Sequence, residues 1–408
     1  MTIETQLAEL IAQFRPHLTD CCVHLLQIPS VNGVDDEIHV AEALVAQAQA
    51  LGLHVLLAGE HPRRPNVIVS TAPHGPTGLL LIGHLDTVPP GEATSWFYPP
   101  FSGQIADGRI YGRGAVDTKG GIAAALYTLA ALAQTPGALA GGRAQLICVP
   151  DEESGATGTL GIRFLAAQGL LSGQGAIYAY SGDDIILGHR GLVRYRLLAT
   201  GAAVHTGSRD WQERAAGANA VTAMARLLLA LEAVMTPYST APYFQAYRTV
   251  ITPGTVIRGG ASINIVPEHC EALVDIRTTP EYDLGRVEHI LQNALSQAAA
   301  PGIHFTYELL NQVPAAVSND QAAIFIQAEA AVRRVKGIQP ARAVAGPANE
   351  GYLLIERGIP TVCGLGPSGA NAHAANEFVE IDGLVDAALI YALVAHGLSQ
   401  DLAGRSGK

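Results

Sequence analysis

The spacing of apolar residues in the first half of the chain predicts helices that alternate with strands. A period of three to four residues, typical of a helix with one buried side, occurs in residues 4–14, 36–51, 120–134 and 159–171. Strands are predicted at residues 66–72, 78–88 and 144–150; the second has the apolar run typical of a strand buried on both faces, and the third is also expected to be buried. This alternation predicts an α/β fold with a mostly parallel sheet flanked by helices.

The pattern changes near residue 188 and returns after about residue 303. The middle segment predicts the order β-α-β-β-α-β, with strands at 192–201, 249–260, 270–280 and 303–308 and helices at 217–235 and 282–298. Later helices are expected at 319–336, 350–357 and 382–398, with a strand at 360–366. We therefore predict a catalytic domain formed by residues 1–190 and 303–408, interrupted by a smaller inserted α+β domain at 191–302.

The composition argues against some classes of partner. The chain of 408 residues has a formal net charge of −11, whereas nucleic acids and anionic membranes are bound by basic surfaces. The N-terminus is acidic and helical in pattern, and the apolar runs fall short of the roughly 18–20 residues of a membrane span. The five cysteines form no CxxC pair. We expect reduced thiols in a cytoplasmic protein.

Ionisable residues gather where the predicted strands end. The stretch "ICVPDEESG" runs from a buried strand into three consecutive acids, Asp151, Glu152 and Glu153, which need a positive partner. His84 and Asp86 stand two residues apart at the end of another buried strand. That spacing places both side chains on the same side of an extended chain.

Two further candidates lie in loops. Asp117 is in the glycine-rich turn "GRGAVDTKGG" before a predicted helix, and His373 follows a predicted strand in "SGANAHAANEF". Because sites in open α/β sheets form at the carboxyl ends of strands, these side chains are expected to converge. Two imidazoles with several carboxylates suit zinc, with cobalt or manganese as alternatives. The surplus of carboxylates suggests two divalent ions bridged by an acid.

The acids near the strand ends are expected to have different roles. One residue of the Glu152–Glu153 pair would bind metal, and the other would take a proton from an activated water, since adjacent side chains point in different directions. Asp86 would accept the second ring N–H of His84 and so fix its tautomer. Asp151 receives no role.

Four motifs, taken together and in order, resemble one family of metallopeptidases. They are "GHLDTVPPG", "DGRIYGRGAVDTKGG", "DEESGATGT" and "AHAANEF". The family is that of acetylornithine deacetylase, succinyl-diaminopimelate desuccinylase, aminoacylase and carboxypeptidase G, and the likeness covers essentially the whole chain. It implies a zinc-exopeptidase-like catalytic domain with two metal ions and an inserted lid domain through which two subunits form a homodimer. It also implies hydrolysis of an amide bond beside a free carboxylate.

The resemblance gives a role to each matched residue of the catalytic domain. His84 is similar to a terminal ligand of one metal and His373 to a terminal ligand of the other, while Asp117 is similar to the bridging carboxylate. Glu152 resembles the general base. Glu153 resembles a ligand of the metal that His373 binds.

Three residues of the inserted domain also match. His205 in "GAAVHTGS" resembles the histidine that reaches the partner subunit's site and helps to hold the oxyanion. Asn264 and Arg277 resemble residues that bind the substrate carboxylate, for which the planar guanidinium is suited. As an alternative, Arg277 would be an edge-strand charge paired with Glu271 or Asp275.

Two positions depart from the family pattern. Relatives carry a metal-binding acid shortly before the segment matched here by "GHRG", but this chain reads "YAYSGDDIILGHRG". Asp183 is the first candidate for that ligand and Asp184 the second, although the match needs a gap. Asn349 stands where relatives often have Asp. We expect this change to alter substrate contacts or the fine position of the late helix, and to leave the core chemistry intact.

The expected substrate is an N-acyl amino acid, such as an N-acetyl or N-succinyl compound. An activated water would attack the acyl carbonyl, with Glu152 as the base and His205 beside the oxyanion. A carboxypeptidase or dipeptidase acting on short peptides with the same two-metal site is the alternative. A single-metal site stays open if neither Asp183 nor Asp184 binds. A non-catalytic metal-binding relative would lack the base or several ligands, and the matched positions retain them.

Overall fold

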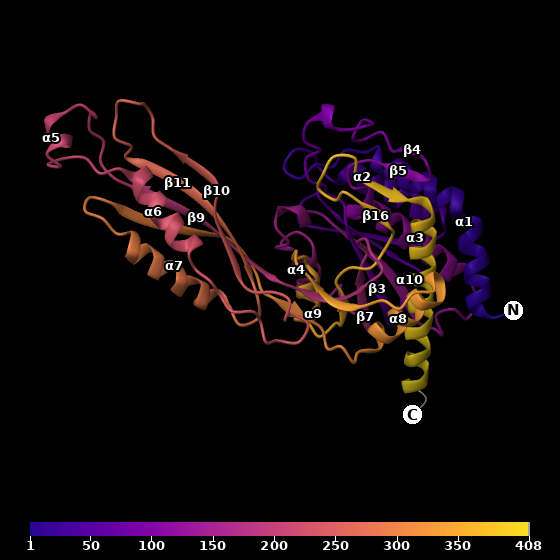
Figure 1. The fold of residues 1–408 in the computed structure, drawn as a ribbon. Helices are drawn as coiled ribbons and strands as arrows, with labels where there is room; N and C mark the ends of the chain where they lie inside the picture. The colour runs from indigo at the N-terminus through magenta and orange to yellow at the C-terminus, as the bar shows by residue number, and fades with distance from the viewer. Residues whose placement is uncertain (407–408) are drawn as a thin grey trace. The chain divides into compact units, whose positions relative to one another are not determined.

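Two compact units make up the computed structural model, which describes residues 1–406 and the side chains of residues 1–401. Unit 1 comprises Met1–His189, Val317–Ala345 and the chain from Asn349 onward. Unit 2 comprises Arg190–Ala316 and Gly346–Ala348. Each unit has its own sheet and its own buried core (Figure 1).

Unit 1 is built on a six-stranded mixed sheet. From edge to edge its strands are β1 (His54–Ala58), β2 (Asn66–Ser70), β6 (Arg143–Val149), β3 (Thr77–His84), β7 (Gly175–Tyr178) and β15 (Thr361–Val362). Strands β6, β3, β7 and β15 run parallel, whereas β2 is antiparallel to both β1 and β6. Every residue of β3 is buried, as its continuous apolar run predicts.

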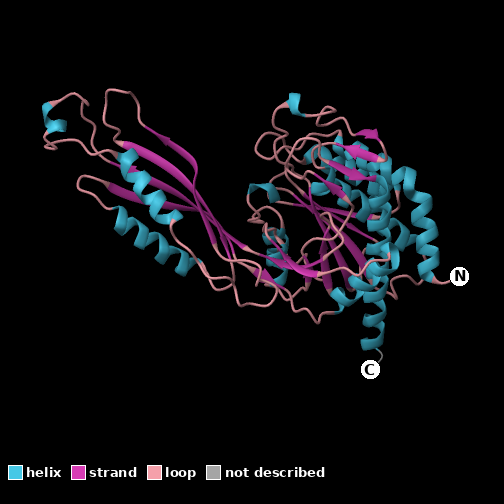
Figure 2. Ribbon diagram, in the orientation of Figure 1, coloured by secondary structure: helices cyan, strands magenta, loops and turns pink. Residues whose placement is uncertain are grey.

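Helices pack against this sheet and against one another. They are α1 (Ile3–Leu26), α2 (Ile38–Ala50), α3 (Gly120–Gln134), α4 (Ile162–Ala167), α8 (Ala323–Lys336), α9 (Gly351–Ile355) and α10 (Ile381–Ser406), with a single turn η1 (Ala93–Ser95). Helices α3 and α10 contact β3 and each other, and α1 and α8 contact α10 (Figures 1 and 2). The core of unit 1 therefore lies between α3, α10 and the central strands.

Two glycines allow α3 to lie directly on the sheet. A Cβ atom on Gly83 of β3 would lie 2.6 Å from Cγ1 of Ile122, and one on Gly121 would lie 1.8 Å from the carbonyl oxygen of Ala179. Packed atoms do not approach so closely. Glycine at these positions therefore lets α3 begin beside the ends of β3 and β7, where the candidate site lies.

Two smaller sheets accompany the main one. The first has the order β13 (Ala316–Val317), β8 (Ile185–His189) and β14 (Arg342–Ala345). The second has the order β16 (Gly369–Ala370), β17 (Phe378–Glu380), β5 (Arg109–Tyr111) and β4 (Gln104–Ala106). Because β17 pairs with β5, the loop before β17 and the loop after β5 come together, although more than half of the chain separates them.

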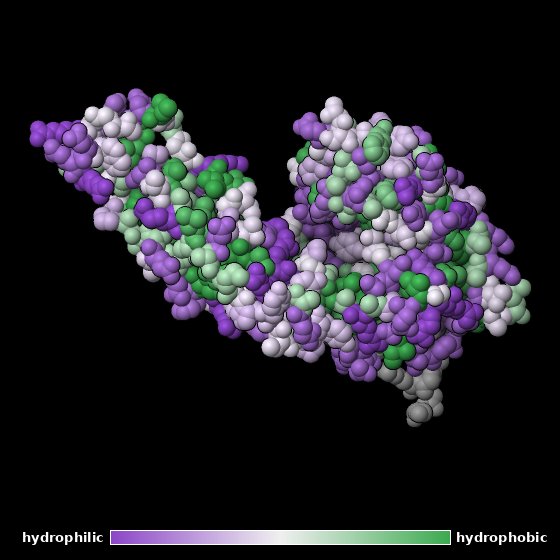
Figure 3. Space-filling model, viewed as in Figure 1, coloured by the Kyte–Doolittle hydropathy of each residue, from purple (hydrophilic) through white to green (hydrophobic). Residues whose placement is uncertain are grey.

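Unit 2 is a four-stranded antiparallel sheet with three helices, two of which pack against it. The strand order is β10 (Val250–Gly259), β11 (His269–Thr278), β9 (Gly191–Thr200) and β12 (His304–Val313), and the helices are α5 (Arg209–Gln212), α6 (Ala220–Glu232) and α7 (Leu284–Ala298). Helices α6 and α7 share a core with the sheet and are antiparallel neighbours in Figure 1. The chain order β9-α6-β10-β11-α7-β12 is the β-α-β-β-α-β order that the sequence predicts. On the face of unit 2 that is turned toward the viewer, Figure 3 shows apolar residues among hydrophilic ones.

Helix α10 is more apolar than the sequence analysis expected. Its segment Ile381–Asp401 has a mean hydropathy of 1.5 and, by length and composition alone, could cross a membrane. Among the described residues it is the one helix with this length and apolar character. However, 61% of its apolar stretch is buried inside the structure, and α10 packs against α1, α3 and α8. This burial is typical of a core helix.

Two predicted helices differ in length from the observed ones. Helix α1 was expected at 4–14 but continues through Pro16 to Leu26. Buried residues beyond the proline, among them Leu18 and Leu25, pack into the core, and this packing outweighs the backbone hydrogen bond that proline removes. Helix α4 spans Ile162–Ala167 rather than 159–171, because glycines flank the shorter segment on both sides.

Candidate metal centre

The parallel strands of unit 1 bring the ionisable residues to one edge of the sheet. His84 is the last residue of β3 and lies in register with Val149, the last residue of β6. The turn with the three acids, which includes η3 (Glu152–Ser154), therefore begins beside His84. Asp117 lies in η2 (Ala115–Lys119), directly before α3.

Four side chains form a connected cluster. Nε2 of His84 lies 2.8 Å from Oδ1 of Asp117, and Nε2 of His373 lies 3.0 Å from Oδ2 of the same carboxylate. Nε2 of His373 also lies 3.1 Å from Oε1 of Glu153. Ligand atoms of His84, Asp117 and Glu153 all lie within 4.8 Å of one another. The Asp117 carboxylate thus stands between the two imidazoles.

Asp86 holds the neighbours of this cluster in place. Its backbone carbonyl lies 2.9 Å from Nδ1 of His84, whereas its carboxylate oxygen Oδ1 is 3.5 Å from that nitrogen. Because a carbonyl can only accept, Nδ1 carries the proton and Nε2 is left as the ligand atom. The carboxylate accepts hydrogen bonds from the backbone N–H groups of Glu152 and Glu153 at 3.2 and 3.0 Å and from Nδ2 of Asn32 at 2.6 Å. Asp86 therefore fixes both the histidine and the acidic turn.

The charges in the cluster stabilise one another. Burial opposes charge on His84, but hydrogen bonds to Asp117 and Asp86 outweigh it and raise the pKa of the imidazole well above its usual value. Hydrogen bonds to Asp117 and Glu153 raise the pKa of His373 to about 10. Burial acts against ionisation of Asp117, but hydrogen bonds to the two imidazoles outweigh it and lower the pKa of this carboxyl. A cation that binds here must displace imidazolium protons.

Glu152 is buried beside the cluster, with 7% of its surface exposed. Burial raises the pKa of its carboxyl to about 8; the charge of His84 opposes this shift, and those of Glu153 and Asp117 add to it. A carboxylate with a pKa near neutrality is suited to take up and return a proton. Burial also raises the pKa of the adjacent Asp151 to about 7.

Glu377 supports the loop that carries Asp117, and the sequence analysis missed it. Its carboxylate accepts hydrogen bonds from the backbone N–H groups of Gly114, Val116 and Asp117 at 3.0, 2.9 and 3.1 Å. It also forms a buried ion pair with Arg113. The available signal was the acid in the "AHAANEF" motif, which stands directly before a strand.

Replacing Glu377 with glutamine should destabilise unit 1 and weaken metal binding. Glutamine leaves Arg113 buried without its charge partner, which costs about 3–5 kcal/mol of the free energy of unfolding. Loss of support behind a metal ligand reduces metal affinity by about 10–100-fold. Thermal unfolding and metal titration measure the two effects. The control is Glu380→Gln, whose exposed carboxylate lies 4.0 Å from Arg109; equal losses in both variants would refute the prediction.

The structure does not bring Asp183 or Asp184 to the cluster. Asp183 forms an ion pair with Lys336, and Oδ1 of Asp184 accepts a hydrogen bond from the backbone N–H of Ala341 at 2.9 Å. Both acids directly precede β8, which pairs with β14 in a separate sheet, so their partners lie beside that sheet. The ligand role expected for Asp183 has no support in this geometry.

Asn349 has a structural role at the start of α9. Its Nδ2 donates to the carbonyl oxygen of Cys363 at 2.6 Å, and its Oδ1 accepts from the backbone N–H of Gly351 at 2.9 Å. The next residue, Glu350, is fully buried and accepts a hydrogen bond from the hydroxyl of Tyr178 at 3.0 Å. Both side chains are engaged within unit 1.

Two of the predicted substrate-binding residues lie together in unit 2. His205 forms an isolated antiparallel bridge with Ile265, and the N–H of Thr206 donates to the carbonyl oxygen of Asn264 at 3.0 Å. The side chains of His205 and Asn264 are both exposed. The backbone pairing therefore places the two residues on neighbouring segments of unit 2.

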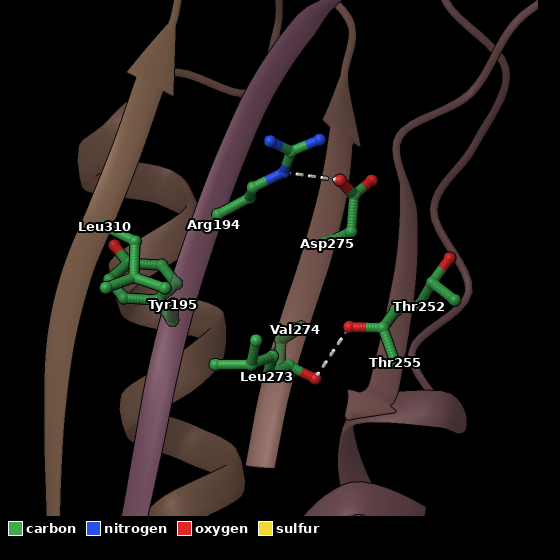
Figure 4. Close-up of a pocket in the computed structure, with 8 residues that line it drawn as sticks. All are labelled: Arg194, Tyr195, Thr252, Thr255, Leu273, Val274, Asp275 and Leu310. Carbon is green, nitrogen blue, oxygen red and sulfur yellow. Dashed lines mark hydrogen bonds and ion pairs between the residues drawn. The ribbon is translucent and has the colours of Figure 1, made fainter. Parts of the chain in front are cut away.

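Arg277 is held within its own sheet. Its Nε donates to Oδ1 of Asp275 at 2.8 Å, and Nε of Arg194 donates to Oδ2 of the same carboxylate at 3.0 Å. Figure 4 shows the Arg194–Asp275 contact in a pocket of unit 2 that Thr252 and Leu310 also line. The structure therefore has the alternative pairing with Asp275, but on an inner strand rather than an edge strand, because β11 lies between β10 and β9.

The donor set of unit 1 suits divalent cations. Imidazole nitrogens and carboxylate oxygens are the donors of zinc and similar ions, and both imidazoles present Nε2 to one shared carboxylate. His84 and Asp117 would hold one ion. Asp117, Glu153 and His373 would hold a second.

Comparison with known sequences decides the family. Residues 80–396 match peptidase family M20/M25/M40. The chain belongs to this family. It is 29% identical over 380 residues to the succinyl-diaminopimelate desuccinylase of Methylobacterium radiotolerans, and the aligned region covers 91% of this chain and 94% of that protein. It is 30% identical over 342 residues to succinyl-diaminopimelate desuccinylase 2 of Shewanella loihica, and the aligned region covers 78% of this chain and 84% of that protein. The family recognised from the motifs is confirmed.

Solved structures of this M20 fold are similar over nearly the whole chain. The dipeptidase Dug1p of Saccharomyces cerevisiae has a TM-score of 0.77 at 17% identity and covers 98% of this chain and 99% of that one. The M20 family metallo-carboxypeptidase Sso-CP2 of Sulfolobus solfataricus has a TM-score of 0.76 at 20% identity, with 93% and 98% covered. These similarities confirm the predicted fold class.

Proposed function

We propose that this M20 metallohydrolase cleaves the amide bond of an N-acyl amino acid and acts as a deacylase of the desuccinylase type. The observation that carries the proposal is the position of buried Glu152 directly beside the cluster of His84, Asp117, Glu153 and His373. The relatives at about 29% identity that carry the name succinyl-diaminopimelate desuccinylase support the substrate class.

In the proposed mechanism the chain supplies a base, rigid ligands and a substrate carboxylate site. Two bound divalent ions would acidify a water and polarise the acyl carbonyl. Glu152 takes the proton from the water and then returns it to the leaving amine. Asp86 keeps Glu152 and His84 in place through the hydrogen bonds to the acidic turn and to Nδ1. Glu377 does the same for Asp117.

Residues of unit 2 would complete the substrate site. Arg277 and Asn264 bind the carboxylate of the substrate, and a guanidinium can do so with two parallel hydrogen bonds. Arg277 must exchange its contact with Asp275 for the substrate when it binds. His205 donates to the oxygen that gains negative charge during attack.

The proposal also covers the metal ions, the oligomeric state and the cellular location of the enzyme. We expect zinc at both positions, with cobalt or manganese as substitutes, because the donors are imidazole and carboxylate groups. We also expect a cytoplasmic homodimer formed through unit 2. The net charge of −11 fits a small-molecule substrate rather than a nucleic acid or an anionic membrane.

A carboxypeptidase or dipeptidase is the second candidate function. The structural neighbours include a dipeptidase and a metallo-carboxypeptidase. The same base and metal ligands would attack a peptide carbonyl in place of an acyl group. The two functions differ in the group on the acyl side of the cleaved bond, which is an acyl group in one case and an amino acid or peptide in the other. Activity on a panel of compounds therefore separates them.

A substrate panel tests the proposed function. Release of free amine is measured with N-succinyl, N-acetyl and N-formyl amino acids beside dipeptides, each with added zinc, cobalt or manganese. We expect cleavage of acyl amino acids in preference to dipeptides. Preferential cleavage of dipeptides would establish the peptidase instead. Failure to cleave any compound while two metals are bound would reject both substrate classes.

Mixed dimers test whether His205 serves the neighbouring active site. A Glu152→Ala chain and a His205→Ala chain should each be nearly inactive alone. After mixing and reassembly, part of the activity should return, because the mixed dimer contains one site with both residues intact. No recovery in mixed dimers that are shown to form would reject the shared site.

A further inference from the structure

The end of β7 places a tyrosine next to the first metal-ligand candidate. Ile82 of β3 pairs with Tyr178 of β7, and the N–H of Ala179 donates to the carbonyl oxygen of Ile82 at 2.8 Å. His84, two residues after Ile82, lies beside Tyr180, two residues after Tyr178. The centroids of their rings are 5.8 Å apart. Because alternate residues of an extended chain point to one side, both rings lie on the same face of the sheet.

Tyr180 is a neutral phenol when no cation is bound. Burial, followed by the charges of Glu152 and Asp117, raises the pKa of its hydroxyl well above the usual value. The neighbouring Tyr178 is stacked on it, with centroids 5.4 Å apart, but the Tyr178 hydroxyl donates to Glu350. Among the described residues no comparable hydrogen bond holds the hydroxyl of Tyr180.

The His84 side of the cluster needs another donor. Asp117 is shared with the opposite imidazole, and Asp183 is paired with Lys336. A cation held by one imidazole and one shared carboxylate has fewer protein ligands than the three or four that zinc takes in proteins. Tyr180 is an oxygen-bearing side chain whose ring lies beside that of His84.

We propose that the Tyr180 oxygen is a protein ligand of the cation held by His84 and Asp117. On binding, the phenol O–H gives its proton to water and the phenolate oxygen coordinates the ion, since metal ligands bind in their deprotonated form. The phenolate supplies one negative charge, as a carboxylate would. This inference rests on the proposed function for the presence of metal at the site, but not for the identity of the substrate.

Copper(II) tests the ligand directly. A phenolate bound to copper(II) gives a charge-transfer absorption in the visible range, which imidazole and carboxylate ligands alone do not give. The chain is stripped with a chelator and loaded with copper. We expect this band in the wild type and in Tyr178→Phe, the matched control on the same strand. We expect it to be absent from Tyr180→Phe.

Zinc binding gives a second and independent measurement. Calorimetric titration should find two zinc ions per wild-type chain. Tyr180→Phe should weaken one of them by at least about 10–100-fold, the loss that even supporting residues of metal ligands produce. Tyr180→Glu, which supplies another anionic oxygen, should recover part of that affinity.

A copper band that persists in Tyr180→Phe would overturn the inference, as would identical zinc binding by the wild type and Tyr180→Phe. If either result came from an enzyme that still hydrolyses its amide substrate, the proposed function would stand and the role of Tyr180 alone would fall. If the wild type bound no zinc, both would fall.

Discussion

Replacing Glu152 with glutamine should remove most of the turnover while metal stays bound. Glutamine has the same shape but cannot take a proton, and a positioned general base contributes about 10²–10⁴-fold to the rate. The residues expected to bind metal, among them His84 and Asp117, are unchanged in this variant. Steady-state kinetics on the best compound of the panel, together with metal content by elemental analysis, measure the two effects.

Asp151→Asn is the matched control for this experiment. Asp151 is the adjacent acid of the same turn and has a positive φ of 63°, which asparagine tolerates well. We expect this variant to keep nearly full activity. If Glu152→Gln were as active as Asp151→Asn, Glu152 would not be the base, and another proton acceptor would have to be found.

Removal of metal should abolish activity and lower the stability of unit 1. A ligand present at 1,000 times its dissociation constant stabilises the folded state by about 4 kcal/mol, and a chelator removes that contribution. The loss is limited because protonated His373 can pair with Asp117 and Glu153 when no cation is bound. Differential scanning calorimetry with and without chelator measures the change, and added zinc should reverse it.

Asp117→Asn provides the matched comparison for metal removal. The Asp117 carboxylate contacts both imidazoles, so the uncharged amide should weaken the binding of both ions. The thermal midpoint of this variant should therefore respond little to chelator.

Metal binding should also release protons, since neighbouring carboxylates hold the pKa of His373 at about 10. The metal affinity should therefore rise with pH. Full activity in chelated protein with no measurable metal would contradict the two-metal proposal.

The sequence predicted best those features of the site that depend on residues close together along the chain. The apolar run of β3 predicts that His84 ends a buried strand, and the apolar period of residues 120–134 predicts the helix that follows Asp117. These features involve neighbours along the chain. They could be predicted because period and composition report local structure directly.

Contacts between distant segments could not be predicted in this way. Asp183 pairs with Lys336, and Glu377 binds the loop before α3; in both cases the partners lie more than 150 residues apart. An acid near a strand end can serve a metal, a helix or a lysine, and its own neighbours do not distinguish these partners. The sequence therefore indicated the type of site and brought forward Asp117 and Glu153, which the structure places in the cluster, but it did not show the lysine partner of Asp183 or the supporting role of Glu377.

The division of unit 1 into separate segments has a consequence for synthesis. Unit 2, Arg190–Ala316 with Gly346–Ala348, lies inside the sequence of unit 1, and its sheet and helices are all translated before β15, His373 and α10. Because domains fold as units while the chain emerges from the ribosome, the inserted unit can be complete while the main sheet still lacks its last strand. The cluster can take up both ions only after His373 has emerged, so metal loading should be a late step in the maturation of this protein.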